Sequence, residues 1–135
     1  MIRNISKVDW NENFKLRMRR NASIKHEVIK LQIVLALLEK YKKNLNWIRI
    51  YTEYPVGNEN ELTKFTDVYF QNIKTKEIIC YEVQNNISDT WLKNTKDFYE
   101  NYDDIFCKTD WVLVKENELS DDIEILQTEI KKIII

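Results

Sequence analysis

The chain has 135 residues, which is enough for one compact domain and too few for two ordinary ones. Hydrophobic residues make up 44% of it and charged residues 32%, which argues against disorder, and its single glycine excludes Gly-rich phosphate loops and dinucleotide fingerprints. The net charge of −1 conceals a basic first part, because residues 1–43 carry 11 Lys or Arg against 4 Asp or Glu. That part suits contacts with phosphates, and the acidic remainder suits a metal ion.

Several classes of site and location are disfavoured by simple counts. The longest apolar run, residues 33–38, is far shorter than the roughly 20 residues that a membrane span needs, and the polar N-terminus lacks a signal-peptide pattern. We therefore expect a cytoplasmic protein with no membrane partner. Cys80 and Cys107 lie outside metal-knuckle and redox spacings, so we expect reduced thiols. The only histidine, His26, leaves no His-rich zinc site and makes a catalytic triad improbable.

The first segment, residues 1–20, is polar and basic. It carries Arg17, Arg19 and Arg20, followed by Lys25 at the start of the next element. The segment is predicted to be a short helix or an arm. Its basic side chains either contact DNA or belong to a solvated surface.

A long helix is predicted from about residue 22 to residue 43. Apolar residues recur there at helical spacing, namely Ile24, Val28, Leu31, Leu35 and Leu38. Glu27 lies at the edge of this stripe, from which it could reach a sheet. Alternatively, it is an ordinary carboxylate of a helix N-terminus that pairs with Lys30 or Arg20.

Three strands follow the helix. Residues 47–54 alternate between apolar and polar, and residues 55–61 form a marked loop. Residues 66–70 and 78–84 are rich in Val, Ile, Tyr and Phe and are separated by a polar turn, which is typical of a β-hairpin. If the turn centres on residues 74 and 75, residues whose numbers sum to 149 face each other, and Asp67 lies opposite Glu82.

Asp67 and Glu82 are the leading candidates for a functional site. Opposed side chains have Cβ atoms roughly 4.5–5.5 Å apart, and like charges at that distance destabilise a sheet. A cation would compensate, and Mg²⁺ is a hard ion that prefers carboxylate oxygens, with Mn²⁺ as a substitute. Gln84 projects from the same face as Glu82. The alternatives are a solvent-facing strand with unrelated charges and, less favoured, the carboxylate pair of a glycosidase.

The remaining chain predicts a helix, a strand and a closing helix. The first helix begins near residue 88 and ends near residue 104, with Leu92, Tyr99 and Tyr102 inward; the apolar strand covers residues 111–114, and the last helix covers residues 119–135. A helical crossover makes the strands on either side of it parallel. We therefore expect a single domain over residues 1–135, an α/β/α three-layer sandwich on a mixed sheet, with an αβββαβ core over residues 22–115.

This pattern resembles the PD-(D/E)XK nuclease superfamily, which includes type II restriction enzymes and archaeal Holliday-junction resolvases. The likeness rests on a helical Glu27, on Asp67 in a strand and on Glu82-x-Gln84 in the next strand, within the αβββαβ order. It implies a Mg²⁺-dependent DNA endonuclease, with branched or junction DNA as one candidate substrate. Asp67, Glu82 and the main-chain carbonyl of Val83 would be metal ligands, and Glu27 would bind a second metal ion or orient water.

The chain departs from the superfamily chiefly at Gln84, which stands where lysine is usual. Some active restriction enzymes have Glu-x-Gln, but a neutral amide cannot supply the positive charge that stabilises a transition state. Lys93 or Lys96 on the following helix could supply it; otherwise both are ordinary surface lysines.

Two further functions therefore stay open: a catalytically weakened DNA-binding protein on a nuclease fold, and a small interaction protein whose partner surface is the acidic C-terminal helix with the tail of residues 133–135. DNA has two strands to cut, so a homodimer is expected, with the C-terminal helix as a candidate interface. The composition, rich in Ile and Asn, suggests an archaeal, viral or mobile-element protein.

Overall fold

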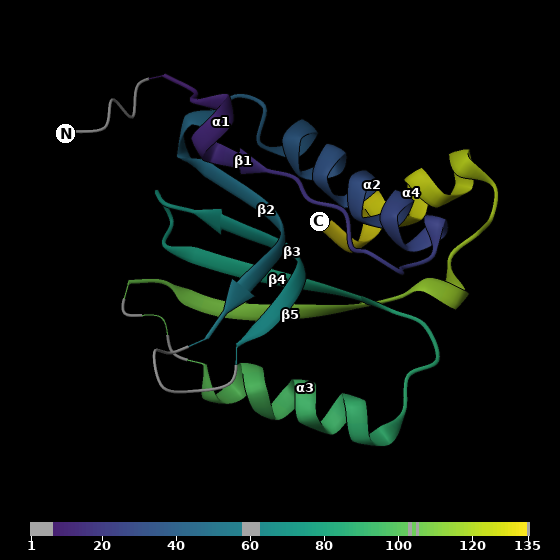
Figure 1. Cartoon of the computed structure of the whole chain (residues 1–135). Coiled ribbons are helices and arrows are strands. Elements are labelled where there is room, and N and C mark those ends of the chain that lie inside the picture. The colour runs from purple at the N-terminus through teal and green to yellow at the C-terminus, as the bar shows by residue number, and fades with distance from the viewer. Residues whose placement is uncertain (1–6, 58–62, 103, 105, 135) are drawn as a thin grey trace.

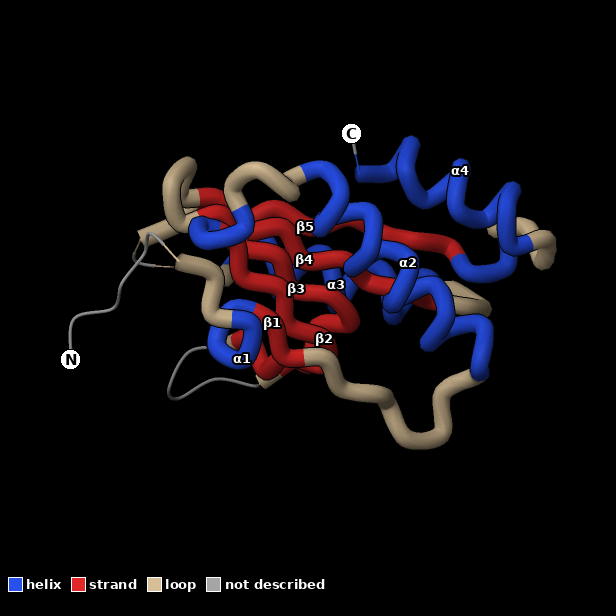
Figure 2. The backbone as a smooth tube through the Cα atoms, turned by 90° about the horizontal axis from the view of Figure 1, so that it is seen from above, coloured by secondary structure: helices blue, strands red, loops and turns tan. Residues whose placement is uncertain are grey.

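The computed structural model describes residues 7–57, 63–102, 104 and 106–134, and its strands form one five-stranded sheet (Figure 1). In chain order the elements are α1 (Trp10–Asn13), β1 (Phe14–Lys15), α2 (Ile24–Lys40), η1 (Leu45–Trp47), β2 (Ile48–Val56), β3 (Lys64–Asn72), β4 (Glu77–Gln84), α3 (Asp89–Asn101), β5 (Lys108–Lys115), η2 (Glu116–Glu118) and α4 (Ile123–Ile134). Helices α2 and α4 cover one face of the sheet and α3 covers the other (Figures 1 and 2). The predicted three-layer α/β/α sandwich is confirmed.

The sheet has the order β1-β2-β3-β4-β5 and mixed direction. β2, β3 and β4 form an antiparallel meander, and β5 runs parallel to β4 after the α3 crossover, as expected. The pairs from Val68↔Tyr81 to Asn72↔Glu77 all have numbers that sum to 149, so the predicted hairpin register is confirmed. The short edge strand β1, which pairs in parallel with β2, was not predicted, because two residues carry no alternation.

The core between α2 and the sheet differs from the sequence prediction. The α2 side chains that pack on the sheet are Ile29, Ile33, Val34 and Leu37, all at most 1% exposed. The predicted stripe was wrong at Ile24, Leu31 and Leu35, which are 74%, 48% and 48% exposed. Its other two members, Val28 and Leu38, are partly buried against the core. The buried face of α2 also carries His26 and Lys30. Because these two residues are polar, the sequence pattern did not indicate that this face is buried.

The helices that follow are shorter than predicted. α3 ends at Asn101 rather than near residue 104, and Leu92 lies at its surface although Tyr99 is buried as expected. α4 begins at Ile123, so Leu119 precedes it, and Leu126, Ile130 and Ile134 are buried in the cluster that α2 also contributes to. Part of the predicted loop over residues 55–61 lies outside the described residues.

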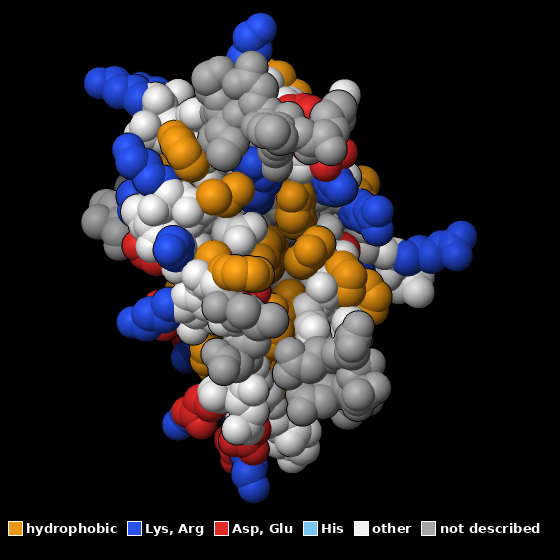
Figure 3. Space-filling model, turned by 90° about the vertical axis from the view of Figure 1, so that its left-hand side faces the viewer, with side chains coloured by type: hydrophobic (Ala, Val, Ile, Leu, Met, Phe, Trp, Pro, Cys, Tyr) orange, Lys and Arg blue, Asp and Glu red, His pale blue; other side chains and the backbone are white. Residues whose placement is uncertain are grey.

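The opposite face of the sheet holds a second cluster, formed with α3 by Val56, Tyr69, Ile78, Cys80 and Tyr99. Seen from the left-hand side of Figure 1, apolar side chains gather in a patch between Lys and Arg side chains (Figure 3). None of the described helices is long and apolar enough to cross a bilayer.

Candidate functional site

Asp67 and Glu82 lie side by side where the ladder between β3 and β4 ends. The last pair of the ladder is Val68↔Tyr81, so the next opposed residues are Asp67 and Glu82, each 4% exposed. The Val83 N–H donates to Asp67 Oδ2 at 2.7 Å. The predicted juxtaposition of the two carboxylates is therefore present, and it is buried.

Glu82 also faces groups from the α3 side of the sheet. The Tyr99 hydroxyl donates a hydrogen bond to Glu82 Oε1. Burial raises the pKa of Glu82; the charge of Lys64 lowers it and that of Asp67 raises it, which leaves the pKa at about 7. Glu82 thus lies between the ionised and protonated states near neutral pH.

Glu53 adds a third strand carboxylate that the sequence analysis missed. The pairs Thr52↔Val68 and Tyr54↔Thr66 place Glu53 opposite Asp67. Its φ of 50° interrupts the β2 ladder, and such a left-handed conformation costs of order 1–3 kcal/mol outside glycine. Burial raises the pKa of Glu53, Lys30 lowers it and the nearby Asp67 raises it, with a net increase. The strained backbone therefore adds a half-buried carboxylate beside Asp67.

The first turn of α2 brings His26 to these strands. Ser23 caps the helix by accepting a hydrogen bond from the His26 N–H at 3.0 Å. The ring Nδ1 lies 2.8 Å from Glu27 Oε2, and Nε2 lies 3.1 Å from the Val83 carbonyl oxygen and 3.3 Å from Asp67 Oδ1. Because a carbonyl or carboxylate oxygen only accepts, both ring nitrogens donate, as in an imidazolium.

The pKa of His26 agrees with this geometry. Burial lowers the pKa of His26, but the hydrogen bonds and charges of Asp67 and Glu27 raise it by more than burial lowers it, to about 9. The ring therefore carries a positive charge at neutral pH. It stands where three of the four predicted metal ligands meet: Glu27, Asp67 and the Val83 carbonyl.

Lys30, one turn further along α2, is the second cation of the site. Its side chain is 3% exposed, and Nζ lies 3.1 Å from Glu27 Oε1 and 2.9 Å from Glu53 Oε1. Burial raises the pKa of Glu27, but the Arg19 N–H, His26 and Lys30 lower it to below its ordinary value. Anions and cations thus alternate from Asp67 through His26, Glu27 and Lys30 to Glu53.

The predicted sources of positive charge lie elsewhere. Lys93 and Lys96 are exposed on α3, and Lys96 lies 3.9 Å from Glu100. Over the part of the chain that the structure describes, no ion pair joins either lysine to the site carboxylates. Gln84 is the half-buried last residue of β4, opposite Lys115. Lys30 instead contacts Glu27 and Glu53, and the charge of Lys64 acts on Glu82.

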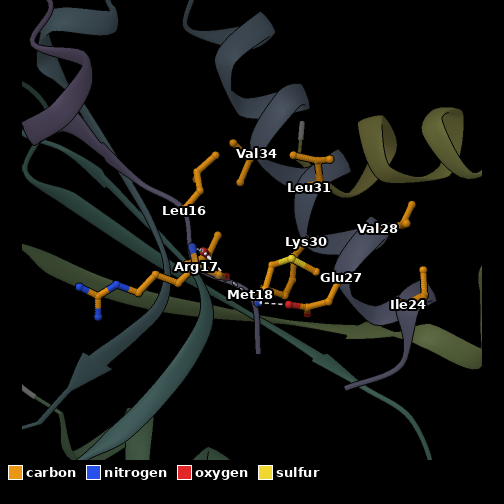
Figure 4. Close-up of a pocket in the computed structure, with 10 residues that line it drawn as sticks. Leu16, Arg17, Met18, Ile24, Glu27, Val28, Lys30, Leu31 and Val34 are labelled. Atoms are coloured by element: carbon orange, nitrogen blue, oxygen red, sulfur yellow. Dashed lines mark hydrogen bonds and ion pairs between the residues drawn. The ribbon is translucent and has the colours of Figure 1, made fainter. Parts of the chain in front are cut away.

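The predicted DNA-binding arginines border the site through their backbone. The Arg17 N–H donates to Thr52 Oγ1, and the Arg19 N–H donates to Glu27 Oε1. Both side chains are exposed, as is that of Arg20, and Arg17 extends away from the site residues in Figure 4. Lys25, in contrast, lies 2.8 Å from Asp121 and ties α2 to the segment before α4.

A groove of about 330 Å³ lies beside Glu27 and Lys30 (Figure 4). Its apolar lining consists of Leu16, Met18, Ile24, Val28, Leu31 and Val34. The groove exists because the apolar residues at α2 positions 24 and 31 face outward rather than toward the core.

Comparisons of the chain with protein-family models, curated proteins and solved structures find no match. Among the described residues, no group of three or more His, Cys, Asp or Glu side chains is arranged to hold a metal ion. The carboxylate oxygens of Asp67 and Glu27 are instead hydrogen-bonded to N–H groups of Val83, His26 and Lys30.

The donor set nevertheless has the chemistry of a hard-cation site. The oxygens of Glu27, Asp67 and the Val83 carbonyl converge on one cationic ring, and Glu82 adjoins them. Mg²⁺ and Mn²⁺ prefer such carboxylate and carbonyl oxygens. The oxygen donors are therefore of the kind that the predicted ion prefers, and the His26 ring lies between them.

The raised pKa values of His26 and Glu82 predict that the protein becomes less stable as pH increases. His26 has a pKa of about 9 in the folded chain against 6.5 ordinarily, so its contribution is complete below 6.5 and is lost as pH rises through 9. Glu82, raised from 4.5 to about 7, also binds more proton when folded, so it lowers stability between those values. We expect the midpoint of urea unfolding to be lower at pH 9 than at pH 6. In a His26→Gln variant the decrease above pH 6.5 should be smaller, and an equal decrease in both proteins would contradict the assignment.

Proposed function

We propose that the chain is a metal-dependent endonuclease that hydrolyses phosphodiester bonds of DNA at the site of Glu27, Asp67 and Glu82. The observation that supports it most is the meeting of two strand carboxylates with a helical glutamate and the Val83 carbonyl. This set lies within the αβββαβ order that accompanies it in the PD-(D/E)XK superfamily.

Each site residue has a role in this proposal. Asp67, Glu82 and the Val83 carbonyl would hold Mg²⁺, and Glu27, which contacts the other nitrogen of the His26 ring, would bind a second metal ion or orient water. The bound ion would polarise a phosphoryl oxygen and lower the pKa of a water molecule. Lys30 provides the fixed positive charge that Gln84 lacks, and it holds Glu27 and Glu53 in place.

The basic segment suits the DNA backbone. The Arg17 and Arg19 N–H groups are hydrogen-bonded to Thr52 and Glu27, so the segment is attached to the site. Its exposed guanidinium groups would pair with phosphates on either side of the bond to be cut. Branched or junction DNA and a location in the cytoplasm belong to the same proposal.

A homodimer completes the proposal, because a duplex or junction offers two strands to one small domain. The packing of Leu126 and Ile130 into the core leaves Ile123 and Ile125 as the exposed apolar residues of α4 for the predicted C-terminal interface. Sedimentation of the chain alone and with DNA would measure this assembly.

The test is cleavage of labelled linear duplex, single-stranded and four-way-junction DNA. We expect cutting of at least one substrate with Mg²⁺ or Mn²⁺ and none with EDTA, since the proposed chemistry needs the ion. Re-adding Mg²⁺ to the EDTA sample should restore cutting, which controls for damage by the chelator. Cleavage that persists in EDTA would contradict the proposal.

The second candidate function is DNA binding without cleavage, and the hydrogen bonds of His26 favour it. The ring already contacts Asp67, Glu27 and the Val83 carbonyl, so it occupies oxygens that an ion would use. Salt-sensitive DNA binding with no cleavage of any substrate under any metal would support this candidate instead.

A further inference from the structure

We propose that His26 is a built-in competitor of the metal ion, so that an ion reaches Asp67 and the Val83 carbonyl only when the ring moves away from them. This inference rests on the proposed function, since it concerns the same metal site. In this inference His26, which is not itself a metal ligand, controls whether the ligands can bind an ion.

The geometry of the ring supports competition for space. A single atom, His26 Nε2, lies 3.1 Å from the Val83 carbonyl oxygen and 3.3 Å from Asp67 Oδ1. Mg²⁺ binds oxygens at about 2.0–2.1 Å, so an ion shared by these two oxygens would take the space of the ring N–H. The ring and the ion therefore exclude each other.

The placement of the ring shows that it is held there firmly. His26 is 5% exposed, its backbone N–H is fixed by the Ser23 cap, and Nδ1 lies 2.8 Å from Glu27 Oε2. Hydrogen bonds that involve charged groups are roughly twice as strong as neutral ones. An ion must replace these bonds before it binds, which weakens its apparent affinity.

Binding of Mn²⁺, measured by the loss of the free-ion electron paramagnetic resonance signal, tests the inference on the wild type and on His26→Ala. We expect the variant to bind Mn²⁺ at least about tenfold more tightly. Lys25→Ala is the matched control: it removes a positive charge one residue away, but Lys25 contacts Asp121 and Leu119 rather than a site oxygen. The Mn²⁺ affinity of Lys25→Ala should stay within about threefold of that of the wild type.

A second measurement uses the wild type, in case His26→Ala does not fold. His26 is the only histidine, so its ring gives one unambiguous set of nuclear magnetic resonance signals. As Mg²⁺ is added, these signals should shift together with the backbone amide of Val83. Ring signals that stay fixed while the Val83 amide shifts to saturation would overturn the inference.

The remaining outcomes separate this inference from the proposed function. If the wild type and His26→Ala bind Mn²⁺ equally and Asp67→Asn does not bind it, the inference fails while the metal site stands. If neither protein binds Mn²⁺, both the inference and the metal-dependent function fail.

Discussion

Replacement of Asp67 by Asn is expected to reduce metal-dependent DNA cleavage by at least about 100-fold, the scale that one lost electrostatic partner at a reacting centre commonly costs. Asp67 adjoins Glu53, Glu82 and His26 together. Asn has the same size, and its carbonyl oxygen can still accept from the Val83 N–H, so the strand ends should keep their geometry. What the substitution removes is the negative charge.

Initial rates of cleavage under saturating Mg²⁺ measure this effect, with circular dichroism as the check on folding. Asp110→Asn is the matched control, because Asp110 is an exposed residue of β5, and its rate should equal that of the wild type. A rate for Asp67→Asn within a few-fold of the control would show that cleavage takes place at another site.

The strand part of the site could be predicted because an antiparallel hairpin obeys simple rules. Side chains alternate with period two, and one turn position fixes every pair that follows. From the location of the turn alone, Asp67 and Glu82 were therefore placed opposite each other, and the ladder confirms that register. The parallel pairing of β4 and β5 followed in the same way from the crossover helix.

The helical part of the site could not be predicted as well, because α2 is apolar on more than one side. Its buried stripe runs through His26, Lys30, Ile33 and Leu37, at helical spacings of four, three and four. Two polar members at the start made this stripe look like the solvent face. A buried polar end of an otherwise apolar stripe is itself a signal, because buried charges need partners.

The position of Lys30 could not be predicted for a related reason. Motif spacing directs attention to Lys93 and Lys96, after Gln84, whereas the lysine that contacts Glu27 and Glu53 belongs to a helix that precedes the sheet in sequence. Glu53 was missed because its role depends on a local backbone conformation, φ of 50°, that ordinary strand alternation does not reveal.

Replacement of Lys30 by Met is expected to lower the free energy of unfolding by about 3–5 kcal/mol, the range for breaking a buried ion pair by removing one partner. Met keeps much of the apolar stem of lysine, so the loss comes from the charge. Nζ lies within 3.1 Å of Glu27 and 2.9 Å of Glu53, and without it two largely buried carboxylates lose their shared cation. Urea unfolding followed by circular dichroism measures the change. Adding Glu53→Gln should restore part of the stability, since it removes one of the two uncompensated charges.

The control is a pair with the same sequence spacing at the surface. Lys42 lies 2.9 Å from Glu39, three residues earlier, as Lys30 does from Glu27 at 3.1 Å, but the Lys42 and Glu39 side chains are 60% and 66% exposed. Water and salt screen such a pair, so Lys42→Met should leave the urea midpoint almost unchanged. Equal losses in the two variants would mean that Lys30 is no more than a surface partner of Glu27. A large loss confined to Lys30→Met would establish that the buried lysine stabilises the arrangement of carboxylates on which the proposed chemistry depends.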